Sequence, residues 1–130
     1  MLTSVRRGAV IVVLLMGGVA CGDDSVAPLA ACDGPVTLQA TSGTIPILRW
    51  SPACLAGRLL VEPLPPSQGF GWHWNLAADE QLIAPGVRYG VAPEGTSEEH
   101  PAWPLEPEQS YTVVLLDAEG TEIGRGEFMP

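Results

Sequence analysis

The sequence predicts an all-β protein, an antiparallel two-sheet sandwich of about seven strands that follows a cleaved signal peptide. The chain of 130 residues contains 15 glycines and 13 prolines, which interrupt helices. Hydrophobic residues make up 46% of the chain, too many for a disordered tail and enough for a core. Short apolar or alternating runs recur about every ten residues, as in sandwiches. The length allows one domain of this kind.

Each expected strand is bounded by glycine, proline or polar turn residues. In chain order the expected strands are residues 35–40, 44–50, 57–62, 69–76, 81–92, 110–116 and 121–128. Prolines are expected to end the third strand, and the polar residues 94–101 are expected to form a loop. Residues 110–116 are the strongest strand, because nearly all of them are β-branched, aromatic or leucine. A turn at 117–120 predicts a hairpin with the last strand.

Two of these runs alternate with a period of two, which indicates strands with one apolar face. In the first run the shared face carries Phe70, Trp72, Trp74 and Leu76. In the second run, after a Pro-Gly turn, the shared face carries Val87, Tyr89 and Val91.

Residues 1–20 have the features of a secretory signal peptide. Arg6 and Arg7 precede an uncharged, mostly apolar run at 8–20 that ends in small residues. This run is shorter than the roughly 20 apolar residues that a bilayer-spanning helix needs. The pattern therefore predicts export rather than a transmembrane segment.

Residues 18–21 (Gly-Val-Ala-Cys) resemble the lipobox of bacterial lipoproteins, with a glycine where that motif usually has leucine. The resemblance implies that Cys21 carries diacylglycerol and an acyl chain such as palmitate, and that residues 21–34 form a tether from the membrane of the cell envelope. Gly22 follows the cysteine, where aspartate marks inner-membrane retention in Gram-negative lipoproteins, so the outer membrane is expected in such an organism. An ordinary secreted protein cleaved after Ala20 is the alternative.

The charge of the chain argues against nucleic acid as a partner. The chain has 15 acidic and 6 basic residues, a formal net charge of −9, and its basic residues are all arginine. Nucleic-acid-binding proteins need a basic surface. Anionic headgroups would also repel an acidic surface, so lipid rather than charge would hold the protein at a membrane.

Three cysteines in an exported protein leave one odd thiol unless one of them is modified. If Cys21 carries lipid, Cys32 and Cys54 remain to form a disulfide in an oxidising compartment. A hairpin between the strands at 35–40 and 44–50, centred on Gly43, supports this pairing. The register of that hairpin would place the following residues opposite each other: Val36 and Trp50, Leu38 and Leu48, Ala40 and Pro46, Cys32 and Cys54.

Two segments resemble elements of fibronectin type III domains. Residues 105–113 (Leu-Glu-Pro-Glu-Gln-Ser-Tyr-Thr-Val) are similar to the Leu-x-Pro-Gly-Thr-x-Tyr-x-Val element, whose tyrosine, here Tyr111, makes a corner contact that closes the sandwich. Residues 48–52 (Leu-Arg-Trp-Ser-Pro) resemble the second strand, whose tryptophan, here Trp50, lies in the core. The resemblance implies a fibronectin type III-like domain at 35–130 with a role in binding or scaffolding, although a fold alone assigns no function.

Tryptophans are the candidates for a binding surface. Trp72, His73 and Trp74, together with Phe70 and Trp103, are expected to be able to form an aromatic platform of the kind that stacks on sugar rings or on proline-rich peptides. The alternative interpretation is that Trp72 and Trp74 belong to the core face of their strand. Trp103, in a loop between alanine and proline, is then the better candidate for exposure.

Catalytic and metal-binding patterns are not found. Glu98, Glu99 and His100 are adjacent on a polar stretch and are not expected to converge on a cation. His73 has no recognisable catalytic partner, and the sequence lacks a nucleophile elbow, a phosphate loop and metal-ligand spacing. We therefore expect no enzyme activity, no cofactor and no metal.

Three hypotheses for the function follow from the sequence. The first is an envelope lipoprotein whose sandwich domain binds or scaffolds a protein partner of unknown identity. The second is a carbohydrate-binding module that uses exposed tryptophans. The third is a periplasmic enzyme inhibitor or accessory subunit, suggested by small size, a disulfide and acidity.

Overall fold

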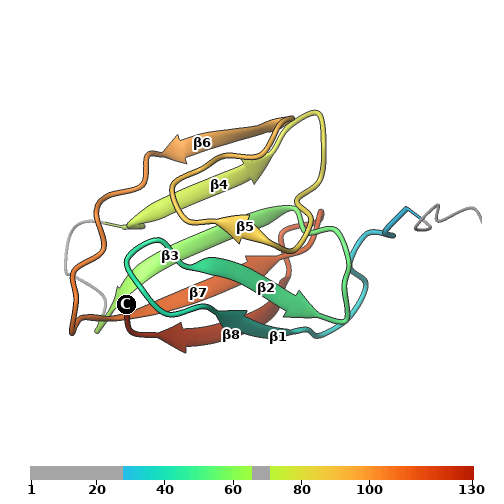
Figure 1. Ribbon diagram of the computed structural model, residues 1–130. Helices are drawn as coiled ribbons and strands as arrows, with labels where there is room; N and C mark the ends of the chain where they lie inside the picture. The colour runs from blue at the N-terminus through green and yellow to red at the C-terminus, as the bar shows by residue number, and fades with distance from the viewer. Residues whose placement is uncertain (1–27, 66–70) are drawn as a thin grey trace, which may run out of the picture.

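Two antiparallel sheets form the computed structural model, which describes residues 28–65 and 71–130 (Figure 1). The smaller sheet has the strand order β1-β2-β5, and the larger sheet has the order β6-β4-β3-β7-β8. The strands are β1 (Thr37–Ala40), β2 (Ile47–Ser51), β3 (Arg58–Leu64), β4 (Trp74–Ala78), β5 (Val87–Arg88), β6 (Thr96–His100), β7 (Ser110–Leu116) and β8 (Glu122–Phe128). The prediction of an all-β antiparallel sandwich is confirmed. The expected signal peptide and Cys21 lie outside the described residues.

The hairpin of β7 and β8 matches the sequence prediction most closely. β7 has the predicted bounds, and it pairs with β8 from Tyr111 opposite Phe128 to Leu116 opposite Glu122. The turn between them is organised by Asp117, whose carboxylate accepts hydrogen bonds from the backbone N–H groups of Glu119 (3.0 Å) and Thr121 (2.9 Å). An aspartate that bonds to its own turn in this way favours the reversal of the chain.

The prediction of a loop at 94–101 is wrong, because β6 lies there and pairs antiparallel with β4. The polar composition of β6 is typical of a loop. β6 is at the edge of the larger sheet, and Ser97, Glu98 and Glu99 are exposed. Charged side chains are common on edge strands because they discourage pairing with other chains.

The strand expected at 81–92 is reduced to the two residues of β5. Gly86 and Gly90 adopt positive φ angles of 96° and 81°, which extended strands do not tolerate, and they interrupt the run on both sides of β5. Val87 and Tyr89 are buried as predicted, but Val91 is 55% exposed. The prediction that Val91 shares their buried face is therefore wrong.

The strands at 57–62 and 69–76 are displaced toward the C-terminus. β3 continues through Pro63, which pairs with Tyr111 of β7. β3 pairs with β4 only as far as Val61, so a proline without an N–H donor is tolerated beyond that point. β4 begins at Trp74, which leaves Trp72 before the strand.

The hairpin of β1 and β2 is shifted by two residues from the predicted register. Leu38 lies opposite Trp50 and Ala40 lies opposite Leu48. Thr41 lengthens the turn, since its N–H donates to the carbonyl oxygen of Ile47 (3.1 Å) and its hydroxyl accepts from the N–H of Ile47 (2.8 Å). A shift of two residues keeps every side chain on its predicted face.

The disulfide between Cys32 and Cys54 is present, with its Cα atoms 4.9 Å apart. The predicted register placed the disulfide on a continuation of the hairpin of β1 and β2, and this part of the prediction is wrong. Ala31 instead forms a parallel bridge with Leu55, and the N–H of Cys32 donates to the carbonyl oxygen of Leu55 at 2.8 Å. The end of the expected tether is therefore attached to the sandwich.

Apolar side chains from both sheets form the core. The largest fully buried residues include Leu48, Leu59, Val61, Trp74, Leu76, Ile83, Tyr111 and Leu115. Trp50 is also buried, and its indole N–H donates to the carbonyl oxygen of Cys54 (2.8 Å). Its position agrees with what the fibronectin type III resemblance implies for the tryptophan of the second strand.

Tyr111 makes the corner contact that the same resemblance implies. Its ring is buried at the start of β7, and its hydroxyl accepts a hydrogen bond of 2.8 Å from the backbone N–H of Glu106. This bond attaches the segment before β7 to the sandwich.

We expect Tyr111→Phe to lower the free energy of unfolding by about 1 kcal/mol, because the variant loses this hydrogen bond while the ring stays packed. Urea denaturation measures the change, and the slope of the free energy against urea should stay as in the wild type. Equal stability of the two proteins would mean that the corner contact does not stabilise this sandwich.

β1 and β8 bring the two sheets together along one side of the sandwich (Figure 1), where the N–H of Val36 donates to the carbonyl oxygen of Ile123 (2.8 Å). Glycines on β8 allow this approach. A Cβ atom on Gly124 would lie 2.7 Å from Cγ2 of Val36, and one on Gly126 would lie 3.1 Å from Cβ of Leu38. Side chains at these positions would push β1 away from β8.

Gly124→Ala is expected to lower the free energy of unfolding by about 1–3 kcal/mol, since overpacking forces the neighbouring strand to move. Thermal denaturation followed by circular dichroism provides the measurement. Gly34→Ala is the matched control, because nothing lies within 4 Å of its added Cβ and its backbone is not left-handed. If both variants lose the same stability, the contact between β1 and β8 is not the cause.

Candidate functional site

Trp103 lies on the connection from β6 to β7, on the side of the sandwich opposite the contact of β1 and β8. Its backbone N–H donates to the carbonyl oxygen of His73 (3.1 Å), next to β4. Its carbonyl oxygen accepts from the hydroxyl of Tyr89 (2.7 Å), next to β5. The connection is therefore hydrogen-bonded to residues beside both sheets, and the backbone of Trp103 is held at both of its polar groups.

Both histidines of the chain contact the ring of Trp103. The ring centroid of His73 lies 5.6 Å away and that of His100 lies 4.7 Å away, both in edge-to-face orientation. Nε2 of His73 is also 3.0 Å from the carbonyl oxygen of Pro104, an acceptor, so His73 donates there. Edge-to-face packing against two rings restricts the rotation of the indole.

A cleft of about 400 Å³ opens beside Trp103. Its lining comes from the turn between β1 and β2, from the residues after β5 and from the connection between β6 and β7. The lining residues are Thr44, Ile45, Tyr89, Gly90, Ala102, Trp103, Pro104 and Leu105. None of them carries a formal charge, and the volume is within the range of about 300–1,000 Å³ that small-ligand sites occupy.

Exposed apolar side chains gather at this cleft. Four large hydrophobic residues are exposed among the described residues: Ile45 (63%), Val91 (55%), Trp103 (43%) and Met129 (56%). Ile45 and Trp103 line the cleft, and Val91 follows the lining residue Gly90 in the chain. Contiguous exposed apolar surface on a soluble domain commonly marks an interaction site.

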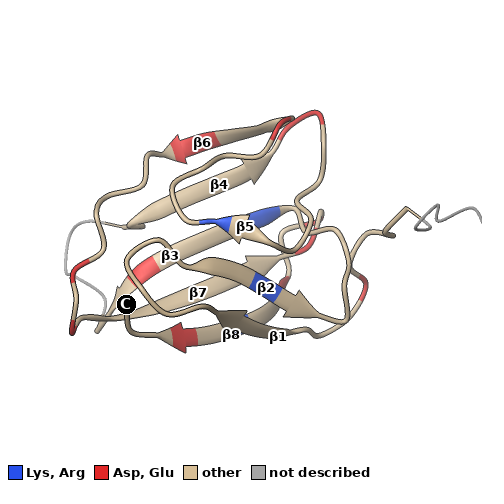
Figure 2. Cartoon of the chain, in the orientation of Figure 1, with Lys and Arg blue, Asp and Glu red and all other residues tan. Residues whose placement is uncertain are grey.

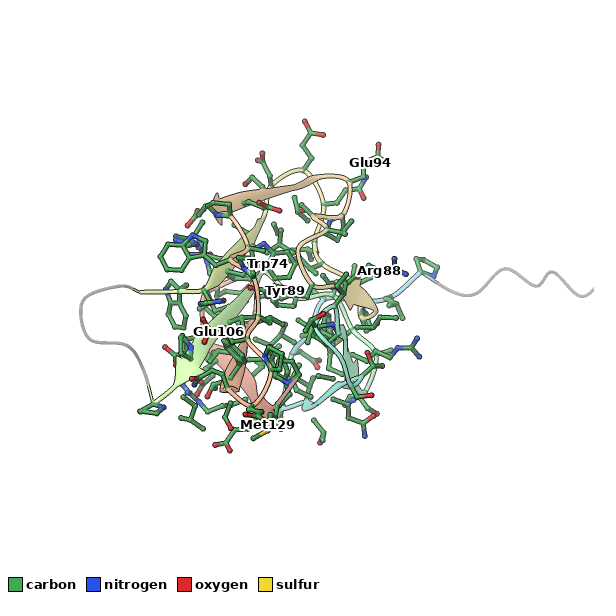
Figure 3. The ribbon with its side chains drawn as sticks, turned by 60° about the vertical axis from the view of Figure 1, so that its left-hand side comes forward. Trp74, Arg88, Tyr89, Glu94, Glu106 and Met129 are labelled. Carbon is green, nitrogen blue, oxygen red and sulfur yellow. A yellow bond between two sulfur atoms is a disulfide. The ribbon has the colours of Figure 1, made fainter. Side chains whose placement is uncertain are left out.

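The hydroxyl of Tyr89 takes part in a structural hydrogen bond. Burial raises the pKa of Tyr89 above its usual value, and the nearby hydroxyl of Tyr111 adds to the shift. The neutral hydroxyl is therefore kept over the physiological pH range and remains a donor to the carbonyl oxygen of Trp103. Figure 3 shows Tyr89 beside Trp74, and the two rings lie 5.2 Å apart.

The other predicted tryptophans are less accessible than Trp103. Trp74 is fully buried and lies in the core, as the alternative interpretation held for its strand face. Trp72 is half-buried, and Phe70 falls outside the described residues. Of the three candidate binding tryptophans, the structure thus places Trp103 at an open cleft and Trp74 out of reach of a surface ligand.

Glu98, Glu99 and His100 do not gather around a common point. The carboxylate of Glu99 pairs with Arg58, whose guanidinium donates to it at 2.5 Å and also to Oδ1 of Asn75 at 2.9 Å. The hydrogen bond and charge of Arg58 hold the pKa of Glu99 below its usual value. The ring of His100 instead contacts Trp103. Within residues 28–65 and 71–130 no three His, Cys, Asp or Glu side chains are placed to hold a metal ion.

The sequence prediction of this site was incomplete. It grouped Trp103 with His73 in one aromatic platform but missed Ile45, Tyr89 and His100 as neighbours of Trp103. These residues come from separate turns and strands, so no local pattern joins them. Ile45 was expected within the strand at 44–50, and only the longer turn observed between β1 and β2 leaves it exposed.

Comparisons of the chain with protein-family models, with curated proteins and with solved structures gave no match. Within residues 28–65 and 71–130, no helix is long and apolar enough to cross a membrane.

Proposed function

We propose that this chain is a bacterial cell-envelope lipoprotein, anchored through Cys21, whose fibronectin type III-like domain acts by binding a partner rather than by catalysis. Gly22 favours the outer membrane in a Gram-negative organism. The anchor rests on the lipobox-like residues 18–21 and on the pairing of Cys32 with Cys54, which leaves Cys21 as the odd cysteine.

The observation that carries the binding function is the cleft beside Trp103. A soluble domain gains nothing in stability from exposing Ile45 and Trp103 at one place, whereas a partner that covers them removes apolar surface from water. The hydrogen bonds and ring contacts that hold Trp103 lower the entropy cost of binding, because the surface is already ordered.

Intact mass of the protein purified from its membrane fraction tests the anchor. We expect the mass of residues 21–130 plus diacylglycerol and acyl groups, with a gain of two hydrogens on reduction of the disulfide. A soluble, unlipidated species would contradict the anchor and leave a secreted binding domain.

Site-specific photocrosslinking in the cells that make the protein tests the binding site. A photoreactive phenylalanine derivative in place of Ile45 is expected to give a discrete adduct, and Trp103→Ala should suppress it. The same derivative in place of Glu119 is the control, because the turn of β7 and β8 lies at the other end of the sandwich. An equal yield at both positions, or no adduct at Ile45, would contradict a binding site at the cleft.

A further inference from the structure

The chain enters the sandwich at one end and forms the cleft beside Trp103 at the other. At the first end Ala31 bridges to Leu55, next to the disulfide (Figure 1). We call this the tether end, because residues 21–27 join it to the proposed lipid on Cys21. The turn after β7 belongs to the same end. The turn between β1 and β2 and the connection before β7 line the cleft at the opposite end, which we call the cleft end.

Exposed carboxylates gather at the tether end, in the loops beside the entering chain (Figure 2). Asp79 and Glu119 line a shallow cleft there together with Gly57. The N–H of Asp79 donates to the carbonyl oxygen of Gly95 (3.1 Å), which places Glu94 beside them. A negative surface therefore surrounds the point where the chain enters. The exposed acidic residues of the tether end are Asp33, Asp79, Glu80, Glu94 and Glu119.

Arginine side chains do little to offset these charges. Arg58 begins β3 at the tether end, but its guanidinium is paired with Glu99. Arg125 pairs with carboxylates of β3 and β8. Arg49 and Arg88 belong to the smaller sheet, outside the loops of the tether end. An anionic bilayer therefore repels the tether end over roughly one Debye length, about 8 Å at physiological salt.

The exposed apolar side chains lie away from the tether end. Ile45 and Trp103 line the cleft, and Val91 follows the last lining residue beside β5. Met129 follows β8, whose end pairs with the start of β7 at the cleft end. A domain that rested on a bilayer by its tether end would be expected to present apolar and basic side chains there. The distribution of side chains therefore argues against insertion of the tether end into lipid.

The length of the connection limits how far the domain can turn over. The carbonyl oxygen of Ala30 already accepts from the N–H of Leu55 (2.8 Å), so the sandwich holds the chain from this residue on. Fully extended, the connection from Cys21 to Ala30 would reach about 30 Å. The seven residues of β3 or β7 alone span about 20 Å, and the turns at both ends add to this length. An inverted domain would therefore need almost the whole connection extended along its side.

From these observations we infer that the tether end is the surface that faces the membrane, held off an anionic bilayer by its carboxylates, and that the cleft beside Trp103 faces away from that membrane. This inference rests on the proposed lipid anchor and deepens it by assigning the orientation of the domain. A partner that covers the cleft then approaches from the aqueous compartment rather than from within the anchoring bilayer.

Energy transfer to the membrane measures this orientation. The mature lipoprotein, acylated on Cys21, is reconstituted into vesicles of phosphatidylcholine and phosphatidylglycerol with an acceptor dye on headgroups of the outer leaflet. A donor dye is attached to Glu119→Cys at the tether end or to Glu106→Cys at the cleft end. The two positions are matched, because each replaces an exposed glutamate. We expect the higher transfer efficiency from Glu119→Cys, and equal or reversed efficiencies overturn the inference.

A longer connection tests whether its length sets the orientation. An insertion of about 20 glycine and serine residues after Ser25 is expected to remove most of the difference between the two positions, because a longer flexible linker lets the domain turn. Circular dichroism checks that the labelled proteins are folded. If the insertion leaves the difference unchanged, the short connection does not orient the domain and the inference is overturned.

Salt tests the role of the carboxylates. Raising the salt concentration should raise the transfer efficiency from Glu119→Cys in the anionic vesicles, because salt screens the repulsion that holds the tether end away from the headgroups. Vesicles of phosphatidylcholine alone are the control and should show no such rise. Efficiencies that respond to salt equally in both kinds of vesicle overturn the repulsion.

Flotation of the unlabelled protein with the vesicles separates this inference from the proposed anchor. If the mature protein does not float with vesicles, the anchor and the orientation are both overturned. If it floats but the two labelled positions transfer energy equally, the orientation is overturned while the anchor stands. The adduct at Ile45 tests binding at the cleft independently of either result.

Discussion

Trp74→Ala is expected to lower the free energy of unfolding by about 3–5 kcal/mol, the range for removing a large buried aromatic side chain. Trp74 is fully buried and its ring lies 5.2 Å from that of Tyr89, edge-to-face. The truncation removes these contacts and leaves a cavity between the sheets. Chemical denaturation followed by circular dichroism at equilibrium gives the change directly.

Trp103→Ala is the matched control for this prediction, because it removes the same side chain from an exposed position. We expect a smaller loss, about 1–2 kcal/mol, because the variant loses the edge-to-face contacts with His73 and His100 but leaves no cavity in the core. The two variants therefore separate a tryptophan buried in the core from one that lies at the surface. Similar losses in both would contradict the assignment of Trp74 to the core and of Trp103 to the surface.

Trp74→Phe refines the test. The indole N–H of Trp74 has no hydrogen-bond acceptor among the described residues, and phenylalanine lacks this donor. A smaller ring leaves a smaller cavity than alanine does. We therefore expect Trp74→Phe to lower the free energy of unfolding much less than Trp74→Ala does. Equal losses in the two variants would show that the indole N–H of Trp74 is hydrogen-bonded in the folded protein.

Removal of the disulfide is the second large expected effect. Cys32 and Cys54 are separated by 22 positions, and opening a loop of this size raises the entropy of the unfolded chain. The chain-entropy model gives a loss of about 3 kcal/mol. For a domain of this size that loss corresponds to a decrease of roughly 15 °C in Tm. Thermal denaturation of the variant with Cys32→Ala and Cys54→Ala measures the decrease.

Reduction of the wild type provides the control for the disulfide. The reduced protein and the double variant should melt at similar temperatures, because both lack the same cross-link. A reduced protein that melts like the oxidised one would contradict the prediction and would mean that the bridge between Ala31 and Leu55 holds this segment without the disulfide.

Periodicity and turn residues predicted the strands best where local signals and tertiary pairing agree. β7 is flanked on both sides by β3 and β8, and its apolar sequence already specified a central strand. β6 was missed because its polar sequence is typical of a loop, and its strand conformation depends on pairing with β4. Edge strands with one solvated face and few apolar residues are weakly marked in sequence.

The register of β1 and β2 illustrates a second limit. The alternation of apolar residues specified which side chains face the core, and that assignment held. It could not specify the register itself, because shifts by two residues preserve the faces. The hydrogen bonds of Thr41 with Ile47 selected the observed alignment, and they depend on the geometry of the turn rather than on the pattern of the strands.

The candidate site was predictable only in part for a similar reason. Trp103 was recognisable as an exposed tryptophan from its place beside Pro104. Tyr89 and Ile45 join it from segments that are distant in sequence, and nothing in their local patterns relates them. The cleft forms only when the connection from β6 to β7 packs beside the residues after β5.

The sequence by itself predicted the all-β class and, with Cys21 set aside as the lipidated cysteine, the partnership of Cys32 with Cys54, while the corner role of Tyr111 came from the resemblance to fibronectin type III domains. These features depend on residue types, on alternation and on the number of cysteines, which a linear chain displays directly. Only the tertiary structure decided the register of β1 and β2, the presence of β6 and the assembly of the cleft beside Trp103. Each of these depends on contacts between distant segments, whose energies appear only when the sheets have come together.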